Sequence, residues 1–313
     1  MLRKVIILPA ILLLHGCING PQYTPMTPEV RNSIDSVELY NLTIQEEIKP
    51  DITLTNVSGA LGGGLLAAMI DSSINKGRAA DAQEIINPFY RVTNDIDYRE
   101  HSASQFNSLL ASEFNINQLK DSGEAVLLSE TVLAEKVKKL EANEALLYLS
   151  SFYNFADNSK RLSTSTAAFL YTKSKKPVEG EPKPTYFNRI YYQSDSVGDG
   201  GEDSLVKWAE NNGALYLKTL QESVQRSAEL LIYDLQPVLD ELCTSRVKAD
   251  YLSPYFVFIK QVEGNLVLKK ETGSVIRSKD GALYFISQAT KIEAKENGKT
   301  PSKECNAGQG VKK

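Results

Sequence analysis

The sequence is poor in the residues that carry most nucleophilic and metal chemistry. Its 313 residues include two histidines and three cysteines, and only His101, Cys243 and Cys305 lie beyond the first seventeen positions. A Ser/His/Asp or Cys/His arrangement would have to use His101, which lies in a polar stretch, and no G-x-S-x-G motif is present. Zinc needs more nitrogen and sulfur ligands at closer spacing. We therefore expect no catalytic residue, cofactor or metal from this set.

The chain also lacks an excess of positive charge. It has 35 Lys and Arg against 39 Asp and Glu, a formal net charge of −4. A chain with this balance has no overall electrostatic reason to bind nucleic acid, so we expect no nucleic-acid partner. Its 42% hydrophobic and 24% charged residues are ordinary for a globular protein.

The first sixteen residues differ from everything after them. "MLRK" is a basic segment, "VIILPAILLL" is an apolar run too short to span a bilayer as a mature helix, and "HGC" follows at once. This order is typical of a secretory leader, so residues 1–16 are predicted to be a signal peptide.

The end of the leader carries a second signal. With Leu14 at an aliphatic position, His15 next and Gly16 before Cys17, it resembles the lipobox of bacterial lipoproteins. The resemblance implies cleavage before Cys17, a diacylglyceryl thioether on its sulfur and a further acyl chain, such as palmitate, on the new amino terminus. Two or more acyl chains anchor a protein stably in a lipid bilayer. Ile18 replaces the Asp that favours inner-membrane retention in enteric members, which implies the outer membrane, on its periplasmic side. An uncleaved signal anchor or an ordinary secreted protein is the alternative.

The rest of the chain divides by composition. Three prolines predict that residues 17–33, lipidated at Cys17 as the lipobox resemblance implies, are an extended tether that lifts the body off the bilayer. Residues 34–247 are predicted to form an α+β domain, and residues 248–290 a small β meander joined by glycine turns. Residues 291–313 are polar and charged, and are predicted to be a disordered tail.

Apolar periodicity predicts the elements of the main domain. Steps of three and four predict amphipathic helices over residues 101–114, 128–143 and 204–242, with a kink or break near Gln236 because Pro237 lacks a donor. Alternation rich in Tyr, Phe and Thr predicts antiparallel strands over residues 144–155, 161–173 and 185–195. The predicted fold class is α+β, with an antiparallel or mixed sheet covered by amphipathic helices and a small C-terminal β meander.

The stretch "GALGGGLLAAMIDSSINKGRAADA" contains the most unusual composition. Gly59, Gly62, Gly63 and Gly64 follow a predicted strand and precede a helix of small residues, as a phosphate-binding turn would require. However, no Lys and Ser or Thr close a P-loop, and no acidic residue ends a second strand. The apolar run is too short to span a membrane. We expect a close-packing segment; a nucleotide loop and superficial membrane insertion are the alternatives.

Two further features have competing interpretations. Four acidic residues surround three glycines in "SDSVGDGGED": Asp195, Asp199, Glu202 and Asp203. Oxygen ligands on a flexible loop suit calcium, but the spacing does not match an EF-hand, so we expect a solvated acidic turn. Cys243 and Cys305 can form a disulfide with each other in an oxidising periplasm, or Cys305 can pair between chains.

These features predict a location better than an activity. We expect a lipid-anchored, periplasm-facing envelope protein that contacts the bilayer through acylated Cys17 and acts as a non-enzymatic scaffold or adaptor for an envelope protein partner. One alternative is a periplasmic hydrolase that uses two carboxylates distant in sequence. The other is an auxiliary lipoprotein of a transport system.

Overall fold

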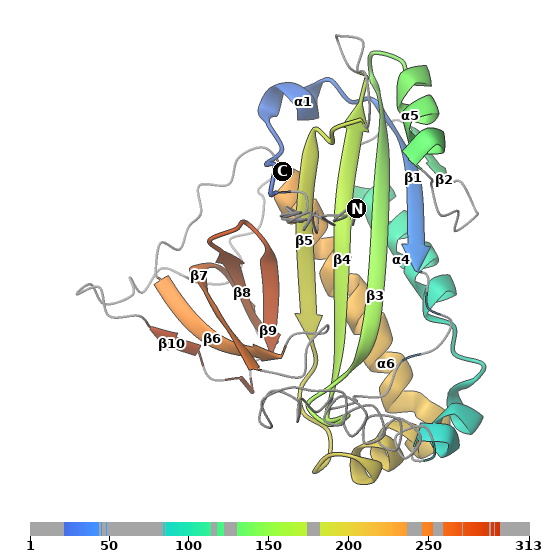
Figure 1. Cartoon of the computed structure of the whole chain (residues 1–313), viewed down its shortest axis with the longest axis vertical. Coiled ribbons are helices and arrows are strands. Elements are labelled where there is room, and N and C mark those ends of the chain that lie inside the picture. The colour runs from blue at the N-terminus through green and yellow to red at the C-terminus, as the bar shows by residue number, and fades with distance from the viewer. Residues whose placement is uncertain are drawn as a thin grey trace, which may run out of the picture.

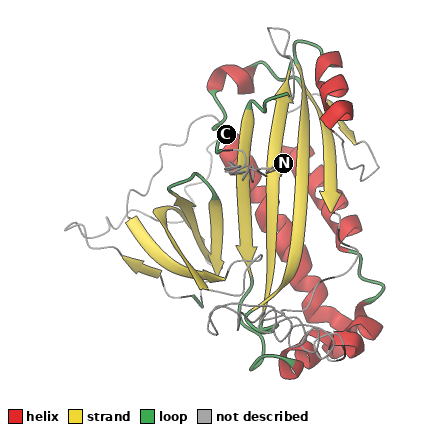
Figure 2. Ribbon diagram, in the orientation of Figure 1, coloured by secondary structure: helices red, strands yellow, loops and turns green. Residues whose placement is uncertain are grey.

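A ten-stranded mixed sheet runs through the part of the chain that the computed structural model describes (Figures 1 and 2). That part comprises residues 22–43, 45, 48, 84, 86–113, 118–121, 130–173, 182–236, 246–252, 259–270, 272–287, 289–290 and 292–294. The strands are β1 (Ser36–Thr43), β2 (Gln118–Asp121), β3 (Glu144–Ala156), β4 (Arg161–Thr172), β5 (Tyr186–Gln193), β6 (Arg246–Leu252), β7 (Ile259–Lys270), β8 (Gly273–Ser278), β9 (Leu283–Ser287) and β10 (Ile292–Ala294). Their spatial order is β10, β6, β7, β8, β9, β5, β4, β3, β1, β2.

The centre of the sheet is the antiparallel meander predicted from the alternating pattern. β3 pairs with β4 from Ala145↔Thr172 to Ala156↔Arg161, and β4 pairs with β5. Each of the three strands begins within one residue of its predicted start. On the far side of β3, β1 pairs with β3 and β2 in parallel, which makes the sheet mixed.

The C-terminal strands extend the same sheet. β6, β7, β8 and β9 form the predicted antiparallel meander, and β9 pairs in parallel with β5 from Ile190↔Leu283 to Tyr192↔Phe285. Adjacent residues of β8 pack into different apolar clusters, because successive side chains of a strand point to opposite faces. Val275 belongs to the main core and Ile276 to a smaller cluster on the other face.

Helices cover one face of the sheet more fully than the other. α4 (Tyr98–Glu113) and the long α6 (Glu202–Leu235) pack on the face of the main core, whereas α5 (Glu130–Lys139) packs on the opposite face against β1, β3 and β4 (Figure 1). The expectation that amphipathic helices cover the sheet is therefore correct only in part, because α4 and α6 contact the strands from β1 to β5 and α5 contacts part of the opposite face. On the other face of the meander, residues of β6 to β9 form their own apolar cluster.

The long helix is interrupted where the sequence predicts continuity. Glu210, Asn211, Asn212 and Gly213 are non-helical, and the last three have φ between 51° and 72°. Asn and Gly tolerate this left-handed conformation best. A Cβ on Gly213 would lie 2.8 Å from the Thr93 Cγ2 atom, so the turn also needs a small residue. The predicted break near Gln236 is confirmed, since the helix ends at Leu235.

Residues 22–33 differ from the expected free tether. Thr24 exchanges two backbone hydrogen bonds of 3.0 Å with Phe187 of β5, and Met26 is buried in the main core. α1 (Pro28–Asn32) follows, with the Thr27 hydroxyl accepting a hydrogen bond from the backbone N–H of Val30. Proline fits both an extended strand and a first helical turn, so the prolines that suggested a spacer are compatible with docking.

Among the described residues, no helix combines the length and apolarity needed to cross a bilayer.

The apolar stripe of α6 provides a test of the core. Leu231 is completely buried, so Leu231→Ala should lower the free energy of unfolding by about 2 to 5 kcal/mol through lost burial and a cavity. Gln225→Ala, on an exposed face of the same helix, should change it by less than about 0.5 kcal/mol. Urea denaturation of both variants measures the difference. Equal midpoints would contradict the core assignment.

Candidate functional site

A groove of about 570 Å³ opens between two helical walls. One wall is the helix formed by residues 86–93, and the other is the first arm of α6, residues 202–209. The apolar residues that line the groove are Pro88, Phe89, Val92, Leu205, Val206 and Ala209. Within each wall they are spaced as neighbours on one helix face, so the groove is the meeting of two apolar faces.

The groove exposes apolar side chains over a buried floor. Phe89 and Leu205 are 2% and 4% exposed, whereas Val92 and Val206 are 38% and 57% exposed. The other large apolar side chains exposed within the described ranges, Val132 and Leu215, do not line the groove. The groove therefore exposes a small apolar patch, formed chiefly by Val92 and Val206, above a packed floor.

Aromatic packing fixes the floor of the groove. The Phe89 ring contacts the rings of Phe155 and Tyr216 edge-on, with centroids 5.4 and 4.9 Å apart. Trp208, on the inner side of the first arm, lies against Phe155, and its Nε1 donates a hydrogen bond of 2.8 Å to the Ser159 carbonyl. Both walls are therefore anchored in the main core, so the groove is preformed.

The acidic loop before α6 organises the start of the first arm. The Asp203 carboxylate accepts a hydrogen bond from the backbone N–H of Asp199 and pairs with Lys207 at 2.9 Å, and these contacts hold the pKa of Asp203 below its usual value. The Ser204 hydroxyl accepts from the Gly200 N–H and donates to the Val197 carbonyl. These contacts show a solvated turn that leads into the helix. The described residues contain no group of three or more His, Cys, Asp or Glu that could hold a metal ion.

Three carboxylates lie at the described rim of the groove. Glu84, Glu202 and Glu210 are exposed and line it, and none of its described lining residues is Lys or Arg. The charge of Lys207, one position beyond Val206, is balanced by Asp203. The groove therefore offers an occupant an apolar floor and an acidic rim.

A buried polar cluster lies at the opposite end of α6. The Asp234 carboxylate accepts hydrogen bonds from the Tyr186 hydroxyl at 2.7 Å and from the Asn188 amide at 2.6 Å, and it pairs with the Arg277 guanidinium at 2.7 Å. The side chain of Asp234 is 1% exposed and that of Arg277 15%. Burial, together with the nearby Asp234 carboxylate, raises the pKa of Tyr186 well above its usual value, so its hydroxyl stays protonated and donates.

The docked N-terminal segment completes this cluster. Arg277 Nη1 donates to the Tyr23 hydroxyl at 3.3 Å and to the Gly281 carbonyl at 3.2 Å, and the Tyr23 ring faces the guanidinium. Gly281 has φ +87°, and a Cβ there would lie 2.2 Å from the Tyr23 ring, so only glycine fits. The cluster thus joins the tether, β5, α6 and β8 at one point.

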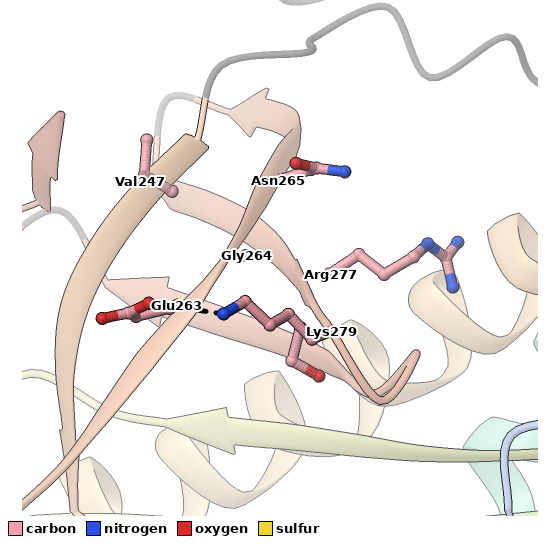
Figure 3. Close-up of a pocket in the computed structure, with 7 residues that line it drawn as sticks. Val247, Glu263, Gly264, Asn265, Arg277 and Lys279 are labelled. Atoms are coloured by element: carbon pink, nitrogen blue, oxygen red, sulfur yellow. Dashed lines mark ion pairs between the residues drawn. The ribbon is translucent and has the colours of Figure 1, made fainter. Parts of the chain in front are cut away.

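Two pockets flank the cluster. One, of about 420 Å³, lies between the docked tether and the turn from β8 to β9, with Arg189, Lys279 and Asp280 among its lining residues. The other, of about 110 Å³, lies between β6, β7 and β8 (Figure 3), where Lys279 Nζ is 3.8 Å from the Glu263 carboxylate. Figure 3 shows Arg277 pointing away from this pair toward a helix, in accord with its contact to Asp234. The smaller pocket lies well below the roughly 300 to 1,000 Å³ of typical ligand sites.

The residues singled out in the sequence lie mostly elsewhere. Outside the described residues are Cys17, Gly59, Gly62, Gly63, Gly64, Cys243 and Cys305. Lipidation, the packing or nucleotide loop and the disulfide therefore stay predictions. His101 lies on α4, away from the groove lining and from the Asp234 cluster.

Sequence reasoning missed both the groove and the buried cluster. One signal was present for the cluster, since Asp234 stands three positions after Leu231 and next to Leu235, on the apolar side of α6. A charged residue at such a position requires a partner, because an unpaired buried charge is costly. No comparable signal marked the groove, whose two walls are far apart in the chain.

The buried pair gives a prediction about stability. Asp234→Asn removes the charge that balances Arg277 and should lower the free energy of unfolding by about 3 to 5 kcal/mol. Lys279→Ala, which breaks the more exposed pair with Glu263 on the same meander, should cost no more than about 1 kcal/mol. Thermal and urea denaturation measure both. If the two variants were equally stable, the Asp234–Arg277 pair would not hold the N-terminal segment, β5, α6 and β8 together.

Comparison of the chain with protein-family models, curated proteins and solved structures gave no match.

Proposed function

We propose that this protein is a lipid-anchored envelope protein that faces the periplasm from the outer membrane and acts as a non-enzymatic adaptor. Its groove binds a segment of a partner protein. The observation that carries the proposal is the exposure of Val206 and Val92 on walls whose inner sides are fixed in the main core. A preformed apolar patch binds a partner without first being ordered, which lowers the entropic cost of binding.

The docked tether supports an anchoring role. Gln22 is the first described residue, and five positions separate it from Cys17. An extended chain covers at most about 3.6 Å per residue, so an acylated Cys17 would hold the Tyr23 end of the body within roughly 18 Å of the bilayer. Because residues 22–33 are packed against the body, the anchor restrains the distance of this end of the body from the bilayer.

The groove lies far from that end. In Figure 1, α1 lies near one end of the long axis, and the start of α6 lies near the other. The second arm of α6, residues 214–235, connects the two regions, and its 22 residues span about 33 Å at 1.5 Å per residue. An anchored molecule would therefore present its groove away from the bilayer, where a periplasmic partner can reach it.

Site-specific photocrosslinking in intact envelopes tests the adaptor function. A photoreactive amino acid at Val92, on the groove, should give one dominant protein adduct, because the partner covers this side chain. The same amino acid at Gln225, exposed on the second arm of α6, should not give that adduct. Introducing Val206→Asp on the facing wall should abolish the Val92 adduct. Identical adducts from both positions, or an adduct that Val206→Asp leaves unchanged, would contradict the proposal.

The Cys17→Ser variant provides the control for the anchor. Without acyl chains the protein should move from the membrane pellet to the soluble periplasmic fraction with its fold intact, because those chains supply the membrane affinity. A variant that still sediments with membranes after high-salt and carbonate washes would show that the anchor lies elsewhere.

A further inference from the structure

We infer that the occupant of the groove is an amphipathic helix of the partner protein, with an apolar stripe toward the groove and Lys or Arg along its flanks. The inference rests on the proposed adaptor function and specifies the chemistry of the segment that is bound.

The backbone chemistry of the walls favours a helix. Both walls are helices, whose backbone N–H and C=O groups point along the helix axis and not across the groove, so mainly side chains face an occupant. An extended peptide that adds to a protein pairs its backbone with a free sheet edge, and the groove is not built from strands. A helix satisfies its own backbone and needs only side-chain contacts. The apolar walls therefore suit a helical segment.

The shape of the groove agrees with this choice. Its apolar side chains lie at steps of three and four on each wall, with Val92 on one side and Val206 on the other. A third helix laid between such faces buries residues at the same spacing and completes a three-helix contact. The exposed halves of Val92 and Val206 would then be covered.

The negative charge at the groove rim favours basic side chains along the flanks of the bound helix. Glu84 precedes the first wall, and Glu202 and Glu210 stand at the two ends of the first arm, so carboxylates border the apolar floor at several points. Arg91 also lies on the first wall, but it is not among the groove lining residues. Basic side chains complement this rim, whereas acidic flanks would be repelled. An anionic lipid surface is repelled for the same reason.

Designed peptides test this inference on the full mature chain carrying Cys17→Ser. Three labelled peptides of equal length are compared by fluorescence anisotropy: an amphipathic helix with Leu at helical spacing and Lys flanks, the same helix with Glu flanks, and a scrambled version of the Lys peptide. The Lys helix should bind at least tenfold more tightly than either of the others. Its affinity should fall as salt is raised, because the rim charges are exposed.

Two matched variants locate the site. Val206→Asp should weaken binding of the Lys helix at least tenfold, whereas Val132→Asp, at an exposed valine on α5 across the sheet, should not change it. Replacing Glu202 and Glu210 together by Gln should reduce both the affinity and its salt dependence. The inference is overturned if the scrambled or the Glu peptide binds equally well, or if Val132→Asp weakens binding as much as Val206→Asp.

The crosslinking experiment separates this inference from the proposed function. A specific partner adduct at Val92, together with peptides that fail to discriminate, would leave the adaptor in place and exclude a basic helix as the ligand. An adduct between Val92 and residues 59–82 of the same chain would show that the groove is filled internally, which overturns both proposals.

Discussion

The structure depends on the buried contact between Asp234 and Arg277. This pair connects the end of α6 to β8, and Tyr186 and Asn188 both donate hydrogen bonds to the Asp234 Oδ2 atom. Burying two charges is costly unless they are paired and hydrogen-bonded, so the pair specifies one arrangement of these elements more than it adds stability. Tyr23 packs on the same Arg277, and the N-terminal segment is thereby included in that arrangement.

α6 connects the Asp234 cluster to the groove at the other end of the helix. Its second arm begins at the glycine turn that contacts Thr93 and ends at the Asp234 cluster, with Leu220, Val224 and Leu231 buried along its length. The first arm turns away at that glycine and forms one wall of the groove (Figure 1). One helix thus fixes the distance between the docked tether and the proposed binding surface. The proposed anchoring and presentation of the groove both depend on the rigidity of this helix.

Local patterns predicted the helices and strands, whereas the Asp234 cluster and the groove depend on contacts between residues distant in the sequence. The alternation over residues 144–195 identified β3, β4 and β5, and the spacing of Leu220, Val224 and Leu231 identified the buried face of α6. The partners of Asp234 lie more than forty positions away in sequence, so periodicity could not find them. The groove is missed for the same reason, since its walls are over one hundred positions apart. The turn within α6 did have a signal, Asn211-Asn212-Gly213, but the apolar spacing after it predicted one continuous helix.

Measuring how far each end of the body lies from the bilayer tests the proposed anchoring and presentation most directly. Lipidated protein is placed in vesicles with a fluorescent headgroup acceptor, Cys243 and Cys305 are replaced by serine, and a donor is attached at Lys279→Cys or Val206→Cys. Lys279 lies beside the docked tether and Val206 lies in the groove. Efficient energy transfer from position 279 and weak transfer from position 206 are expected. Equal transfer from both positions, or stronger transfer from position 206, would contradict an anchored body that presents its groove away from the membrane.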